Sequence, residues 1–215
     1  MLINKVANSN SKLLFLCSPN NPTGNSFEVK SIERLIDEFK GIVVIDEAYI
    51  DFSNKESWTS RLNEFSNLII TQTLSKAYGM AGIRLGICYA SEEIISVLNR
   101  IKPPYNVNIL TQQKAISQLE QQGLTQNQVT NILKERDLLI TKLESIDYIS
   151  KIYPSDANFV LVEVDDANKR YDQLIDKGIV IRNRTTQPGC ENCLRFTIGT
   201  PKENRTLIDT LKSIS

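Results

Sequence analysis

The 215-residue chain contains no histidine. That absence excludes histidine metal ligands, histidine general bases and Ser-His-Asp hydrolytic triads. Any catalysis must therefore use lysine, tyrosine, acidic, serine or cysteine side chains. We predict no metal site.

Long apolar runs are also absent, and no stretch approaches the roughly 18 consecutive apolar residues that span a bilayer. The first residues lack the apolar region of a signal peptide. Lysine plus arginine equals aspartate plus glutamate at 25 each, so no excess charge favours nucleic acid or an anionic membrane. The hydrophobic fraction of 41% is ordinary for a soluble domain. We expect a cytoplasmic globular protein without nucleic-acid or membrane partners.

Cysteine is scarce, with four residues at Cys17, Cys88, Cys190 and Cys193. Without an export signal, a reducing cytoplasm and free thiols are expected. The spacing of Cys190 and Cys193 is one used by zinc and redox sites. Structural zinc needs four ligands, however, and neither histidine nor a second cysteine pair is available. The pattern favours an ordinary loop opened by Gly189.

The first half of the chain alternates apolar runs with a helical pattern. Strands are expected at 12–17, 42–45, 68–70 and 85–89, and a helix over 29–39. The continuous β-branched run at 42–45 is typical of a strand buried on both faces. Strand, helix, strand, strand in this order indicates an α/β fold with a mostly parallel sheet.

The second half resembles a smaller α+β domain in its pattern of elements. We place the boundary at Pro103–Pro104, which gives a first domain over 1–104 and a second over 105–215. The expected elements of the second domain are helices over 112–146 (interrupted near 123–125), 167–177 and 202–214, and strands at 148–153, 158–164, 179–181 and 194–198.

Polar residues stand just past the carboxyl ends of the first three strands: Asn21, Asp46 and Lys76. Ligands of α/β sheets gather at this edge. Each residue has an ordinary interpretation when taken alone. Lys76 and Arg84 could be solvated surface charges, Asp46 a helix cap and Asn21 a turn former.

Together these residues meet the demands of pyridoxal 5'-phosphate (PLP) chemistry. That cofactor needs a lysine amine for its imine, a carboxylate on its pyridine nitrogen and donors on its phenolate oxygen. It also needs hydroxyls and an arginine around its phosphate. Motifs at 18–24, 46–52, 73–86 and 194–200 resemble the fold-type I PLP enzymes, and specifically the histidinol-phosphate aminotransferases.

The resemblance runs from about Lys12 to the C-terminus. It implies that 1–104 is the C-terminal part of the PLP-binding large domain and that 105–215 is the small domain with its linking helix. The N-terminal portion of the family is absent from the sequence. We therefore expect a fragment with impaired activity, whose apolar strand faces meet water without that portion.

Residue roles follow from the same resemblance. Lys76 forms the Schiff base and moves the proton, and Asp46 pairs with the pyridinium nitrogen. The remaining cofactor-binding residues are Asn21 and Tyr49 on the phenolate oxygen, and Thr73, Ser75 and Arg84 on the phosphate.

Arg195, Arg182 and Asn21 are the expected substrate-binding residues. The resemblance implies transamination between histidinol phosphate and 2-oxoglutarate, giving imidazole-acetol phosphate and glutamate in L-histidine biosynthesis, by a homodimer. Two arginines would serve both the phosphate and the glutamate carboxylate, although Arg182 could also be an ordinary strand-end residue. Threonine-phosphate decarboxylase, another class I/II aminotransferase and a non-catalytic remnant remain as alternatives.

Overall fold

The computed structural model describes residue 6 and residues 9–214 of the chain. The chain forms two compact units. Unit 1 comprises Met1–Pro19 and Ser26–Gln126, and unit 2 comprises Asn20–Asn25 and Asn127–Ser215. The division falls beyond Pro103–Pro104 because the helix at 109–119 packs on unit 1, where the Thr111 hydroxyl donates to the Ile83 carbonyl at 3.3 Å. The functional domains predicted at 1–104 and 105–215 stay a prediction.

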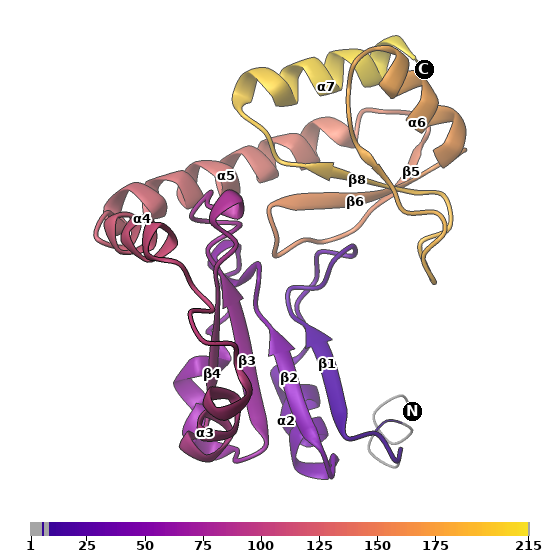
Figure 1. The fold of residues 1–215 in the computed structure, drawn as a ribbon. Helices are drawn as coiled ribbons and strands as arrows, with labels where there is room; N and C mark the ends of the chain where they lie inside the picture. Colours follow the sequence, from indigo (N-terminus) through magenta and orange to yellow (C-terminus); the bar gives the residue numbers. More distant parts are fainter. Residues whose placement is uncertain (1–5, 7–8, 215) are drawn as a thin grey trace. The chain divides into compact units, whose positions relative to one another are not determined.

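A four-stranded sheet forms the centre of unit 1 (Figure 1). Its strands, in spatial order, are β1 (Leu13–Cys17), β2 (Ile42–Asp46), β3 (Leu68–Thr73) and β4 (Gly86–Ala90). The first three strands are parallel and β4 is antiparallel to β3. The carboxyl ends of β1, β2 and β3 therefore meet at one edge, as predicted for an α/β fold.

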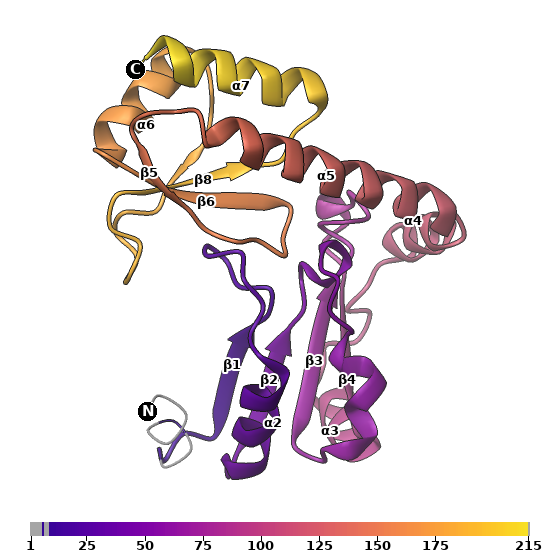
Figure 2. The same cartoon turned by 180° about the vertical axis from the view of Figure 1, so that it is seen from behind.

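One face of this sheet is covered by α2 (Val29–Glu38), seen in front of β2 in Figure 2. Ile32 and Ile36 of α2 pack against Val43 and Ile45 of β2 in one buried cluster. The helical spacing of the apolar residues in 29–39 thus becomes one buried stripe. The other short elements of unit 1 are η1 (Ile50–Phe52), η2 (Trp58–Glu64), η3 (Ala81–Ile83), α3 (Glu92–Ile101) and α4 (Ile109–Leu119).

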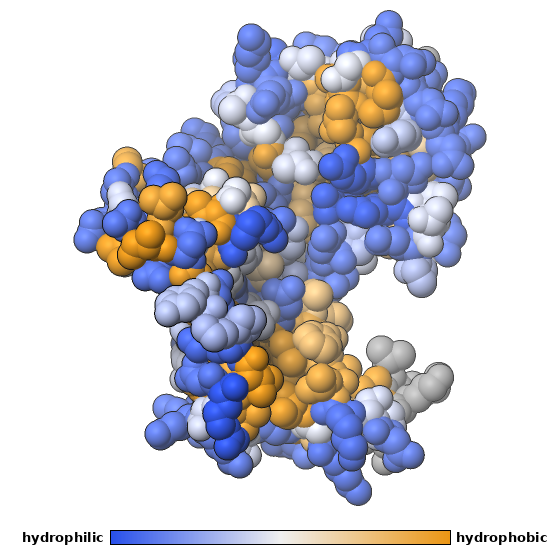
Figure 3. Space-filling view, viewed as in Figure 1, coloured by the Kyte–Doolittle hydropathy of each residue, from blue (hydrophilic) through white to orange (hydrophobic). Residues whose placement is uncertain are grey.

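The opposite face of the sheet carries apolar side chains into solvent. Leu13 and Phe15 of β1 are 53% and 67% exposed, whereas Leu14 and Leu16 pack against the α2-covered core. Side chains alternate between the two faces of a strand, so β1 has one packed and one open side. Figure 3 shows the apolar surface over these strands.

Unit 2 has a four-stranded antiparallel sheet of order β5-β6-β8-β7. Three helices line one face of the sheet (Figure 1). Leu143, Leu174 and Leu211, one from each helix, are fully buried against Val162 and Phe196. The elements are α5 (Gln122–Leu143), β5 (Ile149–Ile152), β6 (Phe159–Val164), α6 (Ala167–Asp176), β7 (Arg182–Asn183), β8 (Cys193–Thr197) and α7 (Pro201–Ser213).

One predicted strand is wrong, and one predicted helix interruption is displaced. Residues 179–181 form no strand, because Gly178 turns at φ 77° and the Ile179 amide donates back to the Leu174 carbonyl, so this stretch closes α6. The interruption predicted near 123–125 is present, but it lies at 120–121, and α5 runs through Gly123. A helical glycine costs only about 1 kcal/mol, which a 22-residue helix tolerates.

Among the described residues, no helix is both long enough and apolar enough to cross a bilayer.

Candidate active site

Asp46 is the last residue of β2, and neutral groups hold its half-buried carboxylate. One oxygen accepts hydrogen bonds from the Ala48 amide at 3.1 Å and the Thr71 hydroxyl at 3.3 Å. The Cys17 thiol lies 4.0 Å from the other oxygen. Burial, and then the charge of Asp46, raise the pKa of that thiol. Among the described residues, no lysine or arginine forms an ion pair with Asp46.

Lys76 lies in the loop after β3, and its side chain is exposed. Its amine is 5.1 Å from the centroid of the Tyr49 ring, a distance typical of a cation–π contact. Tyr49 is buried and comes shortly after Asp46 in the sequence, following Glu47 and Ala48. The structure thus brings Lys76 and Tyr49 together from the ends of adjacent parallel strands.

Thr73 and Ser75 form a compact hydroxyl pair at the end of β3. The Thr73 hydroxyl accepts from the Ser75 amide at 3.1 Å and lies 2.9 Å from the Ser75 hydroxyl. Arg84 ends η3 with φ 55°, and its exposed guanidinium donates to the Ala81 carbonyl at 2.9 Å. No hydrogen bond links Arg84 to Thr73 or Ser75 within the described part of the chain.

Glu47 follows Asp46, and its side chain is only 1% exposed. Its carboxylate accepts from the Ser57 hydroxyl at 2.6 Å, the Trp58 amide at 2.7 Å and the Gln72 amide at 2.8 Å. These bonds fix the end of β2 against β3 and η2. The sequence analysis missed this role, although an acid directly after a buried strand was a signal for it.

Asn21 and Arg195 meet within unit 2. The Arg195 guanidinium donates to the Asn21 side-chain oxygen at 2.6 Å and lies 4.7 Å from the centroid of the Phe159 ring. The aromatic ring and the amide oxygen hold the guanidinium in one orientation. Both residues were predicted to bind substrate, but their direct hydrogen bond was not predicted.

Arg182 lies directly opposite Arg195 in the β7–β8 pairing. It is exposed and borders a cavity of about 410 Å³ that is also lined by Tyr171, Asn183 and Thr186. Cβ atoms of directly opposed residues lie about 4.5–5.5 Å apart, so two arginines here repel each other unless an anion joins them. The Arg182 guanidinium donates to the Ile181 carbonyl at 3.3 Å.

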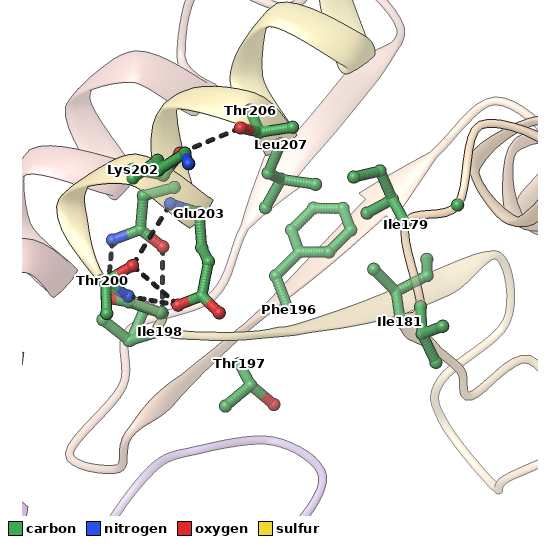
Figure 4. Close-up of a pocket in the computed structure, with 14 residues that line it drawn as sticks. Ile179, Ile181, Phe196, Thr197, Ile198, Thr200, Lys202, Glu203, Thr206 and Leu207 are labelled. Atoms are coloured by element: carbon green, nitrogen blue, oxygen red, sulfur yellow. Dashed lines mark hydrogen bonds between the residues drawn. The ribbon is translucent and has the colours of Figure 1, made fainter.

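A larger hollow of about 730 Å³ lies between the α6–β7 connection, β8 and the start of α7 (Figure 4). Ile179, Phe196 and Leu207 give it an apolar wall, and Thr200 and Glu203 line its polar end. Thr200 and Glu203 already bond each other in the capping box of α7. None of the sequence-predicted site residues lines this hollow.

The chemistry of unit 1 fits PLP. A half-buried carboxylate with only neutral donors suits a cationic ring nitrogen, because a buried charge is stable only when it is paired. The Lys76 amine has no carboxylate partner among the described residues. Two hydroxyls and an exposed guanidinium provide donors of the kind that bind phosphate.

The chain belongs to the aminotransferase class I and II family, whose model matches residues 2–211. Enzymes of this family depend on PLP.

Within that family, the chain is 61% identical over 211 residues to the histidinol-phosphate aminotransferase of Flavobacterium johnsoniae. The match covers 98% of this chain and 60% of that protein, so the chain spans about 60% of the length of the relative.

Solved structures share the fold. The histidinol-phosphate aminotransferase from Clostridium acetobutylicum superposes with a TM-score of 0.92 at 28% identity, over 99% of this chain and 66% of that one. L-threonine-O-3-phosphate decarboxylase from Porphyromonas gingivalis superposes with a TM-score of 0.84 at 24% identity, over 96% and 65%. The second likeness concerns the fold alone.

Proposed function

We propose that this chain supplies the lysine-bearing part of an aminotransferase that exchanges an amino group between histidinol phosphate and 2-oxoglutarate. The products are imidazole-acetol phosphate and glutamate. One observation carries the proposal: Asp46 and Lys76 lie at the ends of adjacent parallel strands, and neither forms an ion pair with any residue that the structure describes. The relatives that cover nearly all of this chain support the choice of substrate.

Bound PLP supplies an electron-accepting ring. Asp46 holds the proton on the nitrogen of that ring, and the Ala48 amide and Thr71 hydroxyl keep its carboxylate oriented. Ser75, Thr73 and Arg84 bind the phosphate, while Tyr49 and Asn21 donate to the phenolate oxygen. Lys76 binds the cofactor and then moves a proton through its amine nitrogen, as a general base and acid.

Arg182 and Arg195 bind the anionic group of the substrate. Their opposed positions across β7 and β8 suit a phosphate, which can accept from both guanidinium groups. The side-chain carboxylate of glutamate needs fewer donors. We expect Arg182→Ala to lose most of its activity with histidinol phosphate and to keep the half-reaction with glutamate, and an equal effect on both would contradict the two-arginine site.

Cofactor binding is the first test. The chain is titrated with PLP, reduced with borohydride and digested, and the modified peptide is identified by mass spectrometry. We expect the label on Lys76, its loss in Lys76→Ala and its retention in Lys55→Ala, a matched change at an exposed lysine. Labelling of several surface lysines, with none favoured, would contradict the site.

Catalysis is the second test. Histidinol phosphate and 2-oxoglutarate are supplied together and glutamate is measured, while threonine phosphate is offered in parallel and released carbon dioxide is measured. Glutamate without carbon dioxide supports the aminotransferase, and the reverse supports the decarboxylase alternative.

A non-catalytic role is the second candidate. It is favoured by the exposure of Leu13 and Phe15 on the open face of unit 1. A chain that neither takes the borohydride label on Lys76 nor makes glutamate would support it.

We further propose a homodimer. Unit 1 exposes apolar side chains around α4, including Tyr105, Ile109, Leu110 and Ile116. Exposed apolar groups of this kind are typical of protein interfaces. Sedimentation equilibrium with Leu110→Glu as the disrupting variant tests the dimer. The cytoplasmic location stays a prediction.

A further inference from the structure

One tight turn holds two cysteines, Cys190 in the loop after β7 and Cys193 as the first residue of β8. The Cys193 amide donates to the Cys190 carbonyl at 3.0 Å, and the Cys190 amide donates to the Gln187 carbonyl at 3.0 Å. Gly189 and Asn192 take the left-handed conformation, with φ 73° and 54°. A four-residue turn keeps its end Cα atoms within about 7 Å. Disulfides span about 4.4–6.8 Å between Cα atoms, so little backbone movement is needed to join these residues.

Both thiols point into the same small cluster. Cys190 and Cys193 are 2% and 0% exposed, and they pack with Leu161 and Tyr153. Burial raises the pKa of both thiols, that of Cys193 to about 11, while the nearby Arg184 opposes the rise at Cys190. Cys190 is the thiol of the pair that lies near a cation.

The surroundings of the pair exclude a protein-built metal site among the described residues, where no three cysteine, histidine or acidic side chains are placed to hold an ion. The residues beside the two thiols, Gly189, Glu191 and Asn192, are exposed, and the Asn192 amide is held by the Thr185 hydroxyl at 2.7 Å. A short local opening of this surface loop would thus admit a small reagent without unfolding unit 2.

We propose that Cys190 and Cys193 are a reversible redox site that forms an intraloop disulfide with a low-molecular-weight disulfide such as oxidised glutathione. The site is independent of the proposed enzymatic function. The Cys190 sulfur, after losing its proton, attacks one glutathione sulfur and releases the first glutathione as a thiolate. The Cys193 sulfur, also deprotonated, then attacks the sulfur of Cys190 and releases the second. The two thiol protons pass to the two released thiolates, and two electrons reduce the glutathione disulfide.

The disulfide would lie at the β8 end of the connection between Arg182 and Arg195. These residues lie opposite each other on β7 and β8. The oxidised form therefore constrains the turn of residues 190–193 at the start of β8, while the hydrogen bonds of the sheet alone join β7 to β8.

The test uses the full chain, folded, in buffers with graded ratios of reduced to oxidised glutathione. Free thiols are trapped by alkylation, and trypsin releases residues 185–195, which carry both cysteines on one peptide. We expect the doubly alkylated peptide to fall at least about tenfold across the series and to be replaced by a species lighter than the reduced peptide by two hydrogens. Cys193→Ser should stop at a glutathione adduct on Cys190.

Exposed Cys88 serves as the internal control for the oxidant. If residues 185–195 remain doubly alkylated after Cys88 has formed its glutathione adduct, the proposal is overturned. The same holds if both cysteines carry separate glutathiones, or if the intraloop bond forms only in urea. Circular dichroism of Cys193→Ser verifies that the variant is folded. The wild-type peptide decides the matter even if this variant fails to fold.

Discussion

The sheets of the two units differ in how completely their apolar side chains are buried. In unit 2, every residue of β6 except Glu163 is buried, and three helices supply a continuous apolar core. In unit 1, α2 covers one face, whereas Leu13 and Phe15 reach solvent on the other. The central strand of unit 2 is therefore buried by residues of unit 2 itself. The sheet of unit 1 has one face packed against α2 and one face open to solvent.

The largest effect should come from the core of unit 2. Leu174→Ala removes a fully buried side chain of α6 and leaves a cavity, so we expect a loss of about 3 kcal/mol of unfolding free energy. Urea unfolding measures the loss. Ile175→Ala, on the same helix at a 38% exposed position, is the matched control. Similar losses of unfolding free energy in the two variants would contradict the buried position of Leu174 in the core of unit 2.

A smaller effect is expected on the packed side of unit 1. Glu47→Ala leaves the Ser57 hydroxyl, the Trp58 amide and the Gln72 amide without their shared acceptor. Unsatisfied buried donors cost about 2 kcal/mol in sum once the variant relaxes. Thermal unfolding is compared with that of Glu56→Ala, a change at an exposed acid. An unchanged midpoint would show that water replaces the carboxylate at no cost.

A pH-dependent effect is expected at Asp165 of unit 2. Its hydrogen bonds to the buried Arg170 guanidinium lower the pKa of the carboxyl. The unfolded group then binds protons more readily, so the pair contributes stability above the unfolded pKa of about 3.9 and loses it as the pH falls. Asp165 is partly exposed, so Asp165→Asn should cost only about 1 kcal/mol at pH 7.

The interaction of Asp165 with Arg170 is tested by measuring the midpoint of urea unfolding at several pH values from 7 to 3. The gap between wild type and Asp165→Asn should narrow toward the acid end, whereas Asp176→Asn should track the wild type throughout. A constant gap would mean that the two residues interact through packing and not through charge.

The smallest effect on stability belongs to the open face of unit 1. Phe15→Ser should change the unfolding free energy by less than about 0.5 kcal/mol, because the ring is already 67% exposed. Light scattering should fall in the same variant, since an apolar surface is removed. Leu14→Ser, one residue away on the packed side, should instead be clearly destabilising. A destabilising Phe15→Ser would show that β1 is packed on both sides in solution.

The strands of unit 1 could be predicted because apolar runs such as 42–45 are explicit in the sequence. The position of Asp46 at a strand end followed from the same run. The strand predicted at 179–181 is wrong, although its three β-branched side chains suit a strand. The glycine before them turns the chain, and the Ile179 amide caps the end of α6 instead. Local pattern cannot weigh those two preferences.

The sequence predicted which residues share a site, but not the individual hydrogen bonds between distant residues. The hydrogen bond from Arg195 to Asn21 depends on the folding of unit 2, and no spacing encodes it. The hydrogen bond from Thr71 to Asp46 depends on the register of β2 on β3. That register is set by the pairing of the two strands and is not evident from the sequence. The Cys190–Cys193 turn was interpreted as an ordinary loop because the sequence does not reveal that both thiols are buried in one cluster.

Side-chain hydrogen bonds hold both ends of the last helix, α7. A capping box at Thr200 satisfies its first amides, the Tyr148 hydroxyl donates to the Leu211 carbonyl at 3.0 Å, and Arg170 donates to the carbonyl of Ile214. Helices lose their amide protons to solvent first by fraying from their termini. In deuterated water, α7 should therefore retain its protons to nearly the same extent from its first turn to its last, and should release them only when the whole of unit 2 opens.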